Sequence, residues 1–168
     1  DLVLRHVPDI RKWVQVPEIA EEGMLSQFAA GYPGLRESEG NLYVDTTGSN
    51  FDDSVLAFYE AYLSVAESLS MEHASRFHLT ESAARGFFAF LKRMESAAVK
   101  PLAVKGQITG PFTFSTAMKD QQGRSLFYDD QMRDMAVKLM AMKAVWQVKQ
   151  LEVIGVPVII FIDEPSLA

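Results

Sequence analysis

The sequence contains no cysteine among its 168 residues, which excludes a disulfide framework and a thiolate metal site within the chain. Its 16 basic and 22 acidic residues form no long run of either sign, so the sequence predicts no basic patch that would bind nucleic acid. No apolar stretch approaches the roughly 20 residues of a membrane helix, and no basic segment followed by an apolar one opens the chain. We therefore expect a cytoplasmic protein that binds neither nucleic acid nor membrane.

What the chain does have is enough apolar sequence for one buried core, since 48% of its residues are hydrophobic. The first residues lack an initiator Met and resemble the tail of an amphipathic helix. The last apolar segment is followed by only a few residues, too few for the helix that should cover it. We expect residues 1–168 to be a single incomplete domain, truncated at both ends.

Hydrophobic periodicity predicts strands and helices in alternation. Residues 102–109 have the pattern of a strand, and the unbroken apolar segment at residues 157–162 indicates a buried strand. The helical spacing at residues 129–154 lies between them. A crossover of that length requires the two strands to be parallel. The earlier sequence predicts a strand at residues 11–17, a strand or hairpin arm at residues 41–45, and helices at residues 18–30, 51–69 and 80–98.

Such alternation narrows the architecture to a βα barrel or an open doubly wound sheet. Neither a dinucleotide fingerprint nor a phosphate loop supports the open sheet, so the barrel is preferred. Because a complete barrel takes about 250 residues, the sequence predicts a partial (βα)8 TIM barrel, its amino-terminal half to two-thirds. Uncovered edges predict self-association or pairing with the missing half.

Acidic residues follow the terminal strand, at the end where parallel folds bind ligands. Asp163 is a candidate ammonium-binding carboxylate at that rim, and Glu164 braces a neighbouring strand. The alternative is that Asp163 caps a helix and Glu164 is solvated. Gln15, at the end of an early strand, contacts either a ligand or loop backbone.

The histidines offer little for metal binding. His73 and His78 have a spacing unlike helical zinc pairs, and no third ligand lies near them in sequence. We predict no metal site in this chain. No residue stands out as catalytic.

Four segments in a fixed order carry a family resemblance. They are residues 13–17 (WVQVP), 23–35 (GMLSQF to GYPGL), 106–113 (GQITGPFT) and 162–165 (IDEP). Together they resemble the cobalamin-independent methionine synthase family, within the superfamily that includes uroporphyrinogen decarboxylase and corrinoid-dependent methyltransferases. The first segment departs from the pattern with Val14 and Val16, where relatives often have Pro and Leu.

The resemblance implies a methyltransferase that moves a methyl group from methylated folate to homocysteine, making methionine. It also implies that Asp163 holds the amino group of the amino-acid substrate, and that Thr109, Gly110 and Thr113 border the same cavity. The alternative for that turn is a threonine that caps a helix.

The family's zinc, which forms the substrate thiolate, is held by histidine, cysteine and glutamate residues in a later part of the barrel. Those ligands are absent from this chain, so we expect it to be inactive by itself. The alternatives are a uroporphyrinogen decarboxylase-like or corrinoid-linked methyltransferase barrel, and a non-catalytic fragment.

Overall fold

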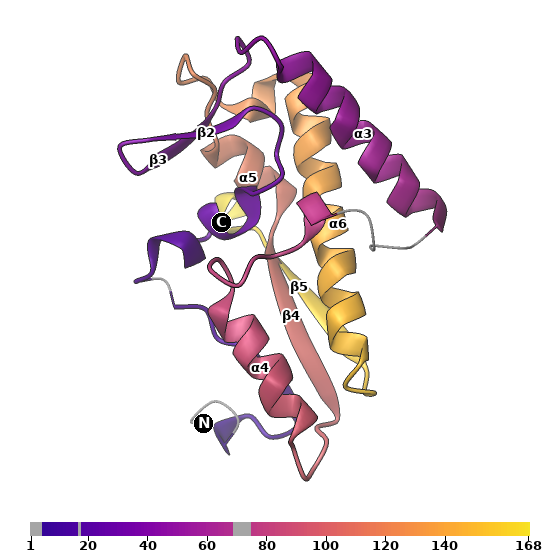
Figure 1. Cartoon of the computed structure of the whole chain (residues 1–168). Helices are drawn as coiled ribbons and strands as arrows, with labels where there is room; N and C mark the ends of the chain where they lie inside the picture. The colour runs from indigo at the N-terminus through magenta and orange to yellow at the C-terminus, as the bar shows by residue number, and fades with distance from the viewer. Residues whose placement is uncertain (1–4, 17, 69–74) are drawn as a thin grey trace.

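The computed structural model describes residues 5–16, 18–68 and 75–168 (Figure 1). Its central feature is a parallel sheet of β1 (Ile10–Lys12), β4 (Ala103–Thr109) and β5 (Val158–Asp163), in the order β1-β4-β5. The segments at residues 102–109 and 157–162 therefore form neighbouring strands, and these strands are parallel, as predicted. Register partners include Lys12 with Lys105 and Thr109 with Asp163.

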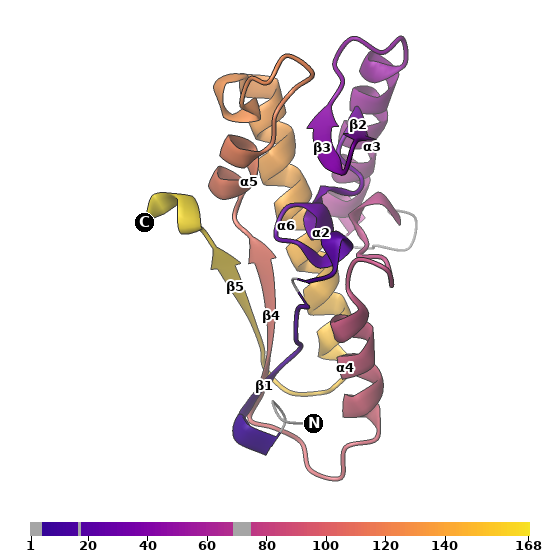
Figure 2. The ribbon, with the colours of Figure 1, turned by 90° about the vertical axis from the view of Figure 1, so that its left-hand side faces the viewer.

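The helix α6 (Asp130–Glu152) packs against β4 and β5. It begins where predicted because the Asp129 side chain accepts a hydrogen bond from Met132 N at 3.0 Å, which caps the helix. Figure 2 shows the three strands side by side, and no described helix is drawn in front of β4 or β5. One face of the sheet is thus covered by α6, and the other stays open along these strands.

Gly106 lets α6 lie close to the sheet. A Cβ at this position would lie 2.6 Å from Ile160 Cδ1 and 2.9 Å from Gln147 Oε1. The Gln147 amide also accepts from Gln107 N at 3.2 Å and donates to Gln107 O at 2.8 Å. Because β1 pairs with β4 only as far as Lys105, this side chain satisfies main-chain groups that no strand reaches.

The remaining helices surround an aromatic core. Phe87 contacts Trp13 and Trp146, with ring centroids 5.7 Å and 5.3 Å away, and Phe58 contacts Phe77 at 5.8 Å. The helices are α2 (Ser26–Ala29), α3 (Phe51–Ser68), α4 (Arg85–Glu95) and α5 (Pro111–Ala117), with short 3-10 turns η1 (Ala20–Glu22), η2 (Ser75–Phe77), η3 (Leu126–Tyr128) and η4 (Pro165–Leu167).

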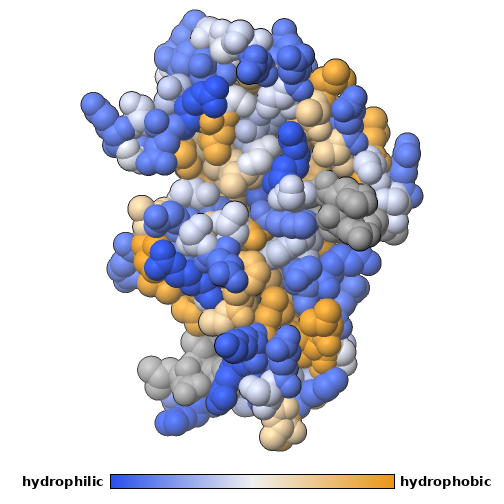
Figure 3. Space-filling model, in the orientation of Figure 1, coloured by the Kyte–Doolittle hydropathy of each residue, from blue (hydrophilic) through white to orange (hydrophobic). Residues whose placement is uncertain are grey.

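The helix α3 packs on α6 through one face only. Tyr59 Oη donates to Asp134 Oδ2 of α6 at 2.8 Å, and Lys138 pairs with the same carboxylate. On the outer side, Leu56 and Leu63 are more than half exposed. Figure 3 shows hydrophobic atoms over this helix, among hydrophilic ones. None of the described helices is long and apolar enough to cross a membrane.

A separate antiparallel hairpin joins β2 (Leu35–Ser38) to β3 (Asn41–Val44). Its two-residue turn has positive φ at both Glu39 (52°) and Gly40 (78°), as a type I′ turn requires. Main-chain bonds from Val44 N to Lys119 O and from Gln121 N to Val44 O attach β3 to the loop after α5.

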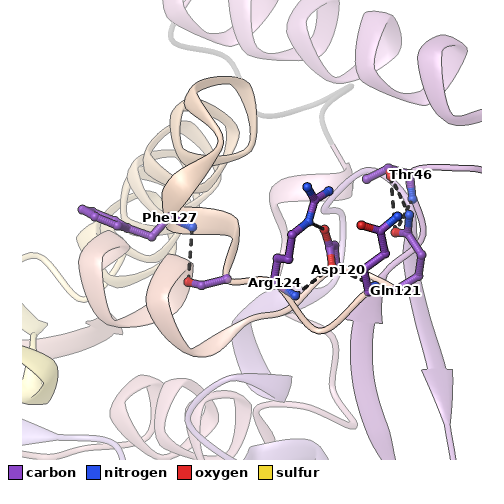
Figure 4. A network of polar contacts seen from close by, with 7 residues as sticks. Thr46, Asp120, Gln121, Arg124 and Phe127 are labelled. Carbon is purple, nitrogen blue, oxygen red and sulfur yellow. Dashed lines mark hydrogen bonds and ion pairs between the residues drawn. The ribbon is translucent and has the colours of Figure 1, made fainter.

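Polar side chains strengthen that attachment (Figure 4). The Gln121 amide exchanges hydrogen bonds with Thr46, and Asp120 accepts from Arg124 Nε at 2.9 Å. Burial alone would raise the pKa of the Asp120 carboxyl, but hydrogen bonds from Arg124 and Gln122 outweigh it and lower the pKa. The hairpin is thus held by a charged loop beside the parallel sheet, and it does not extend that sheet.

The prediction of a partial (βα)8 barrel is wrong. The described chain is a mixed α/β structure with a three-stranded parallel sheet and a two-stranded antiparallel one, and no barrel closes. The physical reason is how the chain folds in the segment that connects β1 to β4. The strand predicted at residues 41–45 pairs with residues 35–38 across a tight turn, so the chain adds no parallel strand there.

Several element boundaries also differ from prediction. The helix expected at residues 18–30 is divided into η1 and α2, and the one expected at residues 80–98 begins only at Arg85. The predicted Thr80 cap therefore precedes the helix by five positions; its hydroxyl accepts from Ala83 N at 3.3 Å. The helices at residues 51–69 and 129–154 are confirmed closely, by α3 and α6.

Lys143 is a cation buried in the middle of α6. Its side chain is fully buried, and it forms no ion pair with a described residue. Its Nζ donates to His78 O at 3.2 Å, which holds the segment after η2 against α6. Burial lowers the pKa of Lys143 to about 7.

This burial predicts a measurable pH dependence of stability. An unfolded lysine has a pKa near 10.4, so between about pH 7 and pH 10 the unfolded chain binds more protons than the folded chain. The free energy of unfolding should therefore rise with pH in this window, and Lys143→Met should stabilise the protein by roughly 4 kcal/mol at pH 7. Urea unfolding of both proteins at a series of pH values measures the difference. Parallel stability curves for the two proteins would contradict the prediction.

Candidate functional site

A cavity of about 470 Å³ opens at the carboxyl end of the parallel sheet. Such edges are where parallel α/β folds bind ligands, because the connecting loops diverge there. The cavity is lined from four parts of the chain: Lys12 of β1 with Trp13, Val14 and Gln15 after it; Glu22, Met24 and Phe28 around η1 and α2; Gln107, Ile108 and Thr109 of β4; and Asp163 of β5.

Strand alternation decides which side chains reach the open face. Gly106 faces α6, so its neighbours Lys105 and Gln107 point to the opposite side. By the same alternation Ile160 lies on the helix side, and Phe161 and Asp163 lie on the open side. The polar residues of β4 and β5 therefore gather on the face that no described helix covers.

A chain of side-chain amides runs across this face. Gln27 Nε2 donates to Ala83 O at 2.6 Å, so its Oε1 is left to accept from Gln15 Nε2. Gln15 Oε1 accepts in turn from Gln107 Nε2, and Gln107 Oε1 faces Lys105 Nζ at 3.4 Å. Because the Ala83 carbonyl can only accept, it fixes which side-chain amide atom donates and which accepts at Gln27, Gln15 and Gln107.

Two further lining residues form the inner wall. Glu22 is buried, and its carboxylate accepts from Val16 N at 2.9 Å and Arg85 N at 3.1 Å, which fastens the loop after β1 to the start of α4. Trp13 is 2% exposed, and its Nε1 has no hydrogen-bond partner among the described residues. The two hydrogen bonds hold the Glu22 carboxylate within the fold, so it has little capacity left to bind a ligand.

Asp163 differs from Glu22 because its carboxylate forms no ion pair or hydrogen bond with a described residue. It is half-buried at the end of β5, beside its register partner Thr109. The Thr109 hydroxyl donates to Met24 O at 2.7 Å, which closes one side of the cavity. An unpaired carboxylate at the mouth of a cavity suits a ligand that carries an ammonium group.

Glu164 points the other way, as alternation along the strand predicts. Its carboxylate accepts from Phe112 N at 3.0 Å and from Thr113 N at 2.7 Å, at the start of α5. Thr113 Oγ1 also accepts from Ser166 N at 3.2 Å. The N-cap residue Gly110 makes no side-chain cap, so Glu164 supplies that function from the residue after β5.

The five predicted site residues are thus divided between two roles. Gln15, Thr109 and Asp163 line the cavity, whereas Gly110 and Thr113 hold the segment after β5 and are not among its lining residues. Whether any of the five binds a substrate stays a prediction.

Sequence reasoning missed Glu22, Gln27 and Gln107. The alternation of polar residues along β4 could have indicated Gln107, since Lys105 and Thr109 flank it at two-residue steps. Nothing in the sequence distinguishes Glu22 from Glu18 or Glu21. Only the approach of α4 singles it out.

The described residues do not fit the zinc that the resemblance implies. They contain no group of three or more His, Cys, Asp or Glu side chains placed to hold a metal ion. His73, half of the histidine pair weighed from the sequence, lies outside the described residues, and His78 stacks on Trp146 with ring centroids 5.7 Å apart. We derive no metal-dependent step for this chain.

Fold and site together define a mixed α/β protein with a polar cavity at the carboxyl edge of a parallel sheet. The chain matches no protein-family model, no curated protein and no solved structure. Its function has to be inferred from its own residues.

The Glu164 cap generates a stability prediction. Glu164→Ala leaves two amides of α5 without their acceptor and should lower the free energy of unfolding by about 1 kcal/mol. Gly110→Ala should cost a similar amount, because a Cβ there would lie 2.0 Å from the Glu164 carboxyl carbon and would displace the side chain that caps α5. Urea unfolding measures both variants.

The two substitutions should also be coupled. In a double-mutant cycle, Gly110→Ala should cost less in the Glu164→Ala background, because the group it collides with is gone. Glu60→Ala, an exposed change on α3, is the control and should have little effect. Additive effects of Gly110→Ala and Glu164→Ala would contradict the proposed contact.

Proposed function

We propose that this chain binds the amino-acid substrate of a methyltransferase that transfers a methyl group from a methylated folate to homocysteine. One observation carries the proposal. Gln15, Thr109 and Asp163 come from three separate segments of the resemblance, and all three line one cavity.

The chemistry of the cavity suits such a substrate. The unpaired Asp163 carboxylate can accept hydrogen bonds from the α-ammonium group. Met24 and Phe28 supply an apolar wall for the sulfur-bearing side chain. A volume of about 470 Å³ lies within the range of about 300–1,000 Å³ typical of small-molecule sites.

The proposal assigns binding to this chain, and not the complete reaction. A thiol attacks as its thiolate, and in the resembled family a metal forms it. The described residues do not supply such a site, so the thiolate chemistry and the folate site belong to a partner that carries the metal ligands this chain lacks. We also propose a cytoplasmic location, which the absence of cysteine supports.

Calorimetry tests the assignment of Asp163. L-homocysteine and L-methionine should both bind the wild-type chain, and Asp163→Asn should weaken each by about tenfold because it removes the charge that holds the ammonium group. N-acetylmethionine, whose amino group is blocked, should bind the wild-type chain no better than L-methionine binds Asp163→Asn.

The control is Asp52→Asn, which removes one negative charge from exposed α3. It should leave both affinities within about twofold. The proposal fails if neither amino acid binds the wild-type chain, or if N-acetylmethionine binds as tightly as methionine.

A further inference from the structure

Two lysines lie side by side on the open face of the sheet. Lys12 and Lys105 are register partners in the parallel pair of β1 and β4, so their side chains leave the sheet on the same face. Neither lysine forms an ion pair with a described residue. Like charges on adjacent strands repel, so the fold holds this pair at a cost.

The Lys105 side chain leans along β4 toward the cavity. Its Nζ lies 3.9 Å from the ring centroid of Phe161 and 3.4 Å from Gln107 Oε1, and both residues are nearer the carboxyl edge. Lys12 itself lines the cavity. The amide series from Ala83 fixes Gln107 Oε1 toward this ammonium group, so Lys105 is positioned by the core of the protein.

The electrostatics agree with this geometry. Burial is the main cause that lowers the pKa of Lys105. The charge of Asp163 opposes it, and the charge of Lys12 lowers the pKa further by a smaller amount. An anion placed between the two ammonium groups would relieve their repulsion. No described carboxylate occupies that position.

We propose that Lys12 and Lys105 form an oxyanion-binding subsite beside the cavity, which takes a carboxylate or phosphate group. Phe161 forms one side of the subsite, and Gln107 keeps Lys105 in place. This subsite goes beyond the proposed amino-acid site and does not depend on it.

The spacing along β4 defines what can fill the subsite. Lys105 precedes Thr109 by four residues, a rise of about 13 Å at about 3.3 Å per residue. Asp163 is the register partner of Thr109, so its backbone lies nearer the carboxyl edge of the open face than that of Lys105. The Lys105 side chain leans toward that edge, and the charge of Asp163 acts on it. The anion is therefore an acidic group of a ligand that also approaches Asp163, or belongs to a second ligand.

Titrations with inorganic phosphate and with glutarate, at constant ionic strength, test the subsite. Amide resonances of residues 12–15 and 105–107 in a ¹⁵N-labelled chain should shift and saturate with at least one of the two anions. Lys12→Gln and Lys105→Gln should each weaken the affinity by about fivefold, the loss expected for one partly exposed charge. Saturation by phosphate alone would identify a phosphorylated ligand, and saturation by glutarate alone a carboxylic acid.

Two controls separate this proposal from its alternatives. Lys92→Gln removes an equal charge from the exposed side of α4 and should leave the anion affinity unchanged. Asp163→Asn should leave anion binding intact or tighten it, even if it abolishes amino-acid binding. The subsite is refuted if neither anion shifts these resonances, or if Lys92→Gln weakens binding as much as the two proposed lysines do.

Discussion

The close approach of α6 to β4 is the contact on which the rest of this structure depends. It requires a residue without a side chain at Gly106, because Ile160 and Gln147 already occupy the space that a Cβ would need. The approach also brings the Gln147 amide to the main chain of Gln107, just beyond the end of β1. It therefore buries one face of the sheet and directs the alternate residues Lys105 and Gln107 to the open face.

The polar groups around the open face are of two kinds. Glu22, Glu164 and the glutamine series have their partners within the fold, and they connect elements that are far apart in the sequence. Asp163 and Lys12 are unpaired among the described residues. Since desolvating a partnerless charge is unfavourable, such groups remain near water until a ligand supplies the partner. The first kind positions the cavity, and the second kind defines which chemistry it can accept.

How well sequence reasoning worked depended on how local each signal was. The bounds of α3 and α6 were predictable because apolar spacing and, for α6, an Asp129 cap act within one segment. The parallel pairing of β4 and β5 followed from the length of the helical connection. The barrel prediction failed because it assumed that the strand at residues 41–45 would join the same sheet, whereas a two-residue turn at Glu39 and Gly40 paired it locally. Nothing in the spacing of apolar residues could separate these outcomes.

By itself, the sequence determined the order of apolar segments and the polar residues that end them, including Gln15, Thr109 and Asp163. Hydrophobic periodicity and helix capping depend on residues close together in the sequence, so they can be recognised from the sequence alone. Only the tertiary structure decided that these three residues meet at one cavity while Gly110 and Thr113 serve the Glu164 cap. The physical reason is that a contact between residues distant in sequence depends on which face each strand turns toward its neighbours, and packing against α6 sets that orientation for β4 and β5.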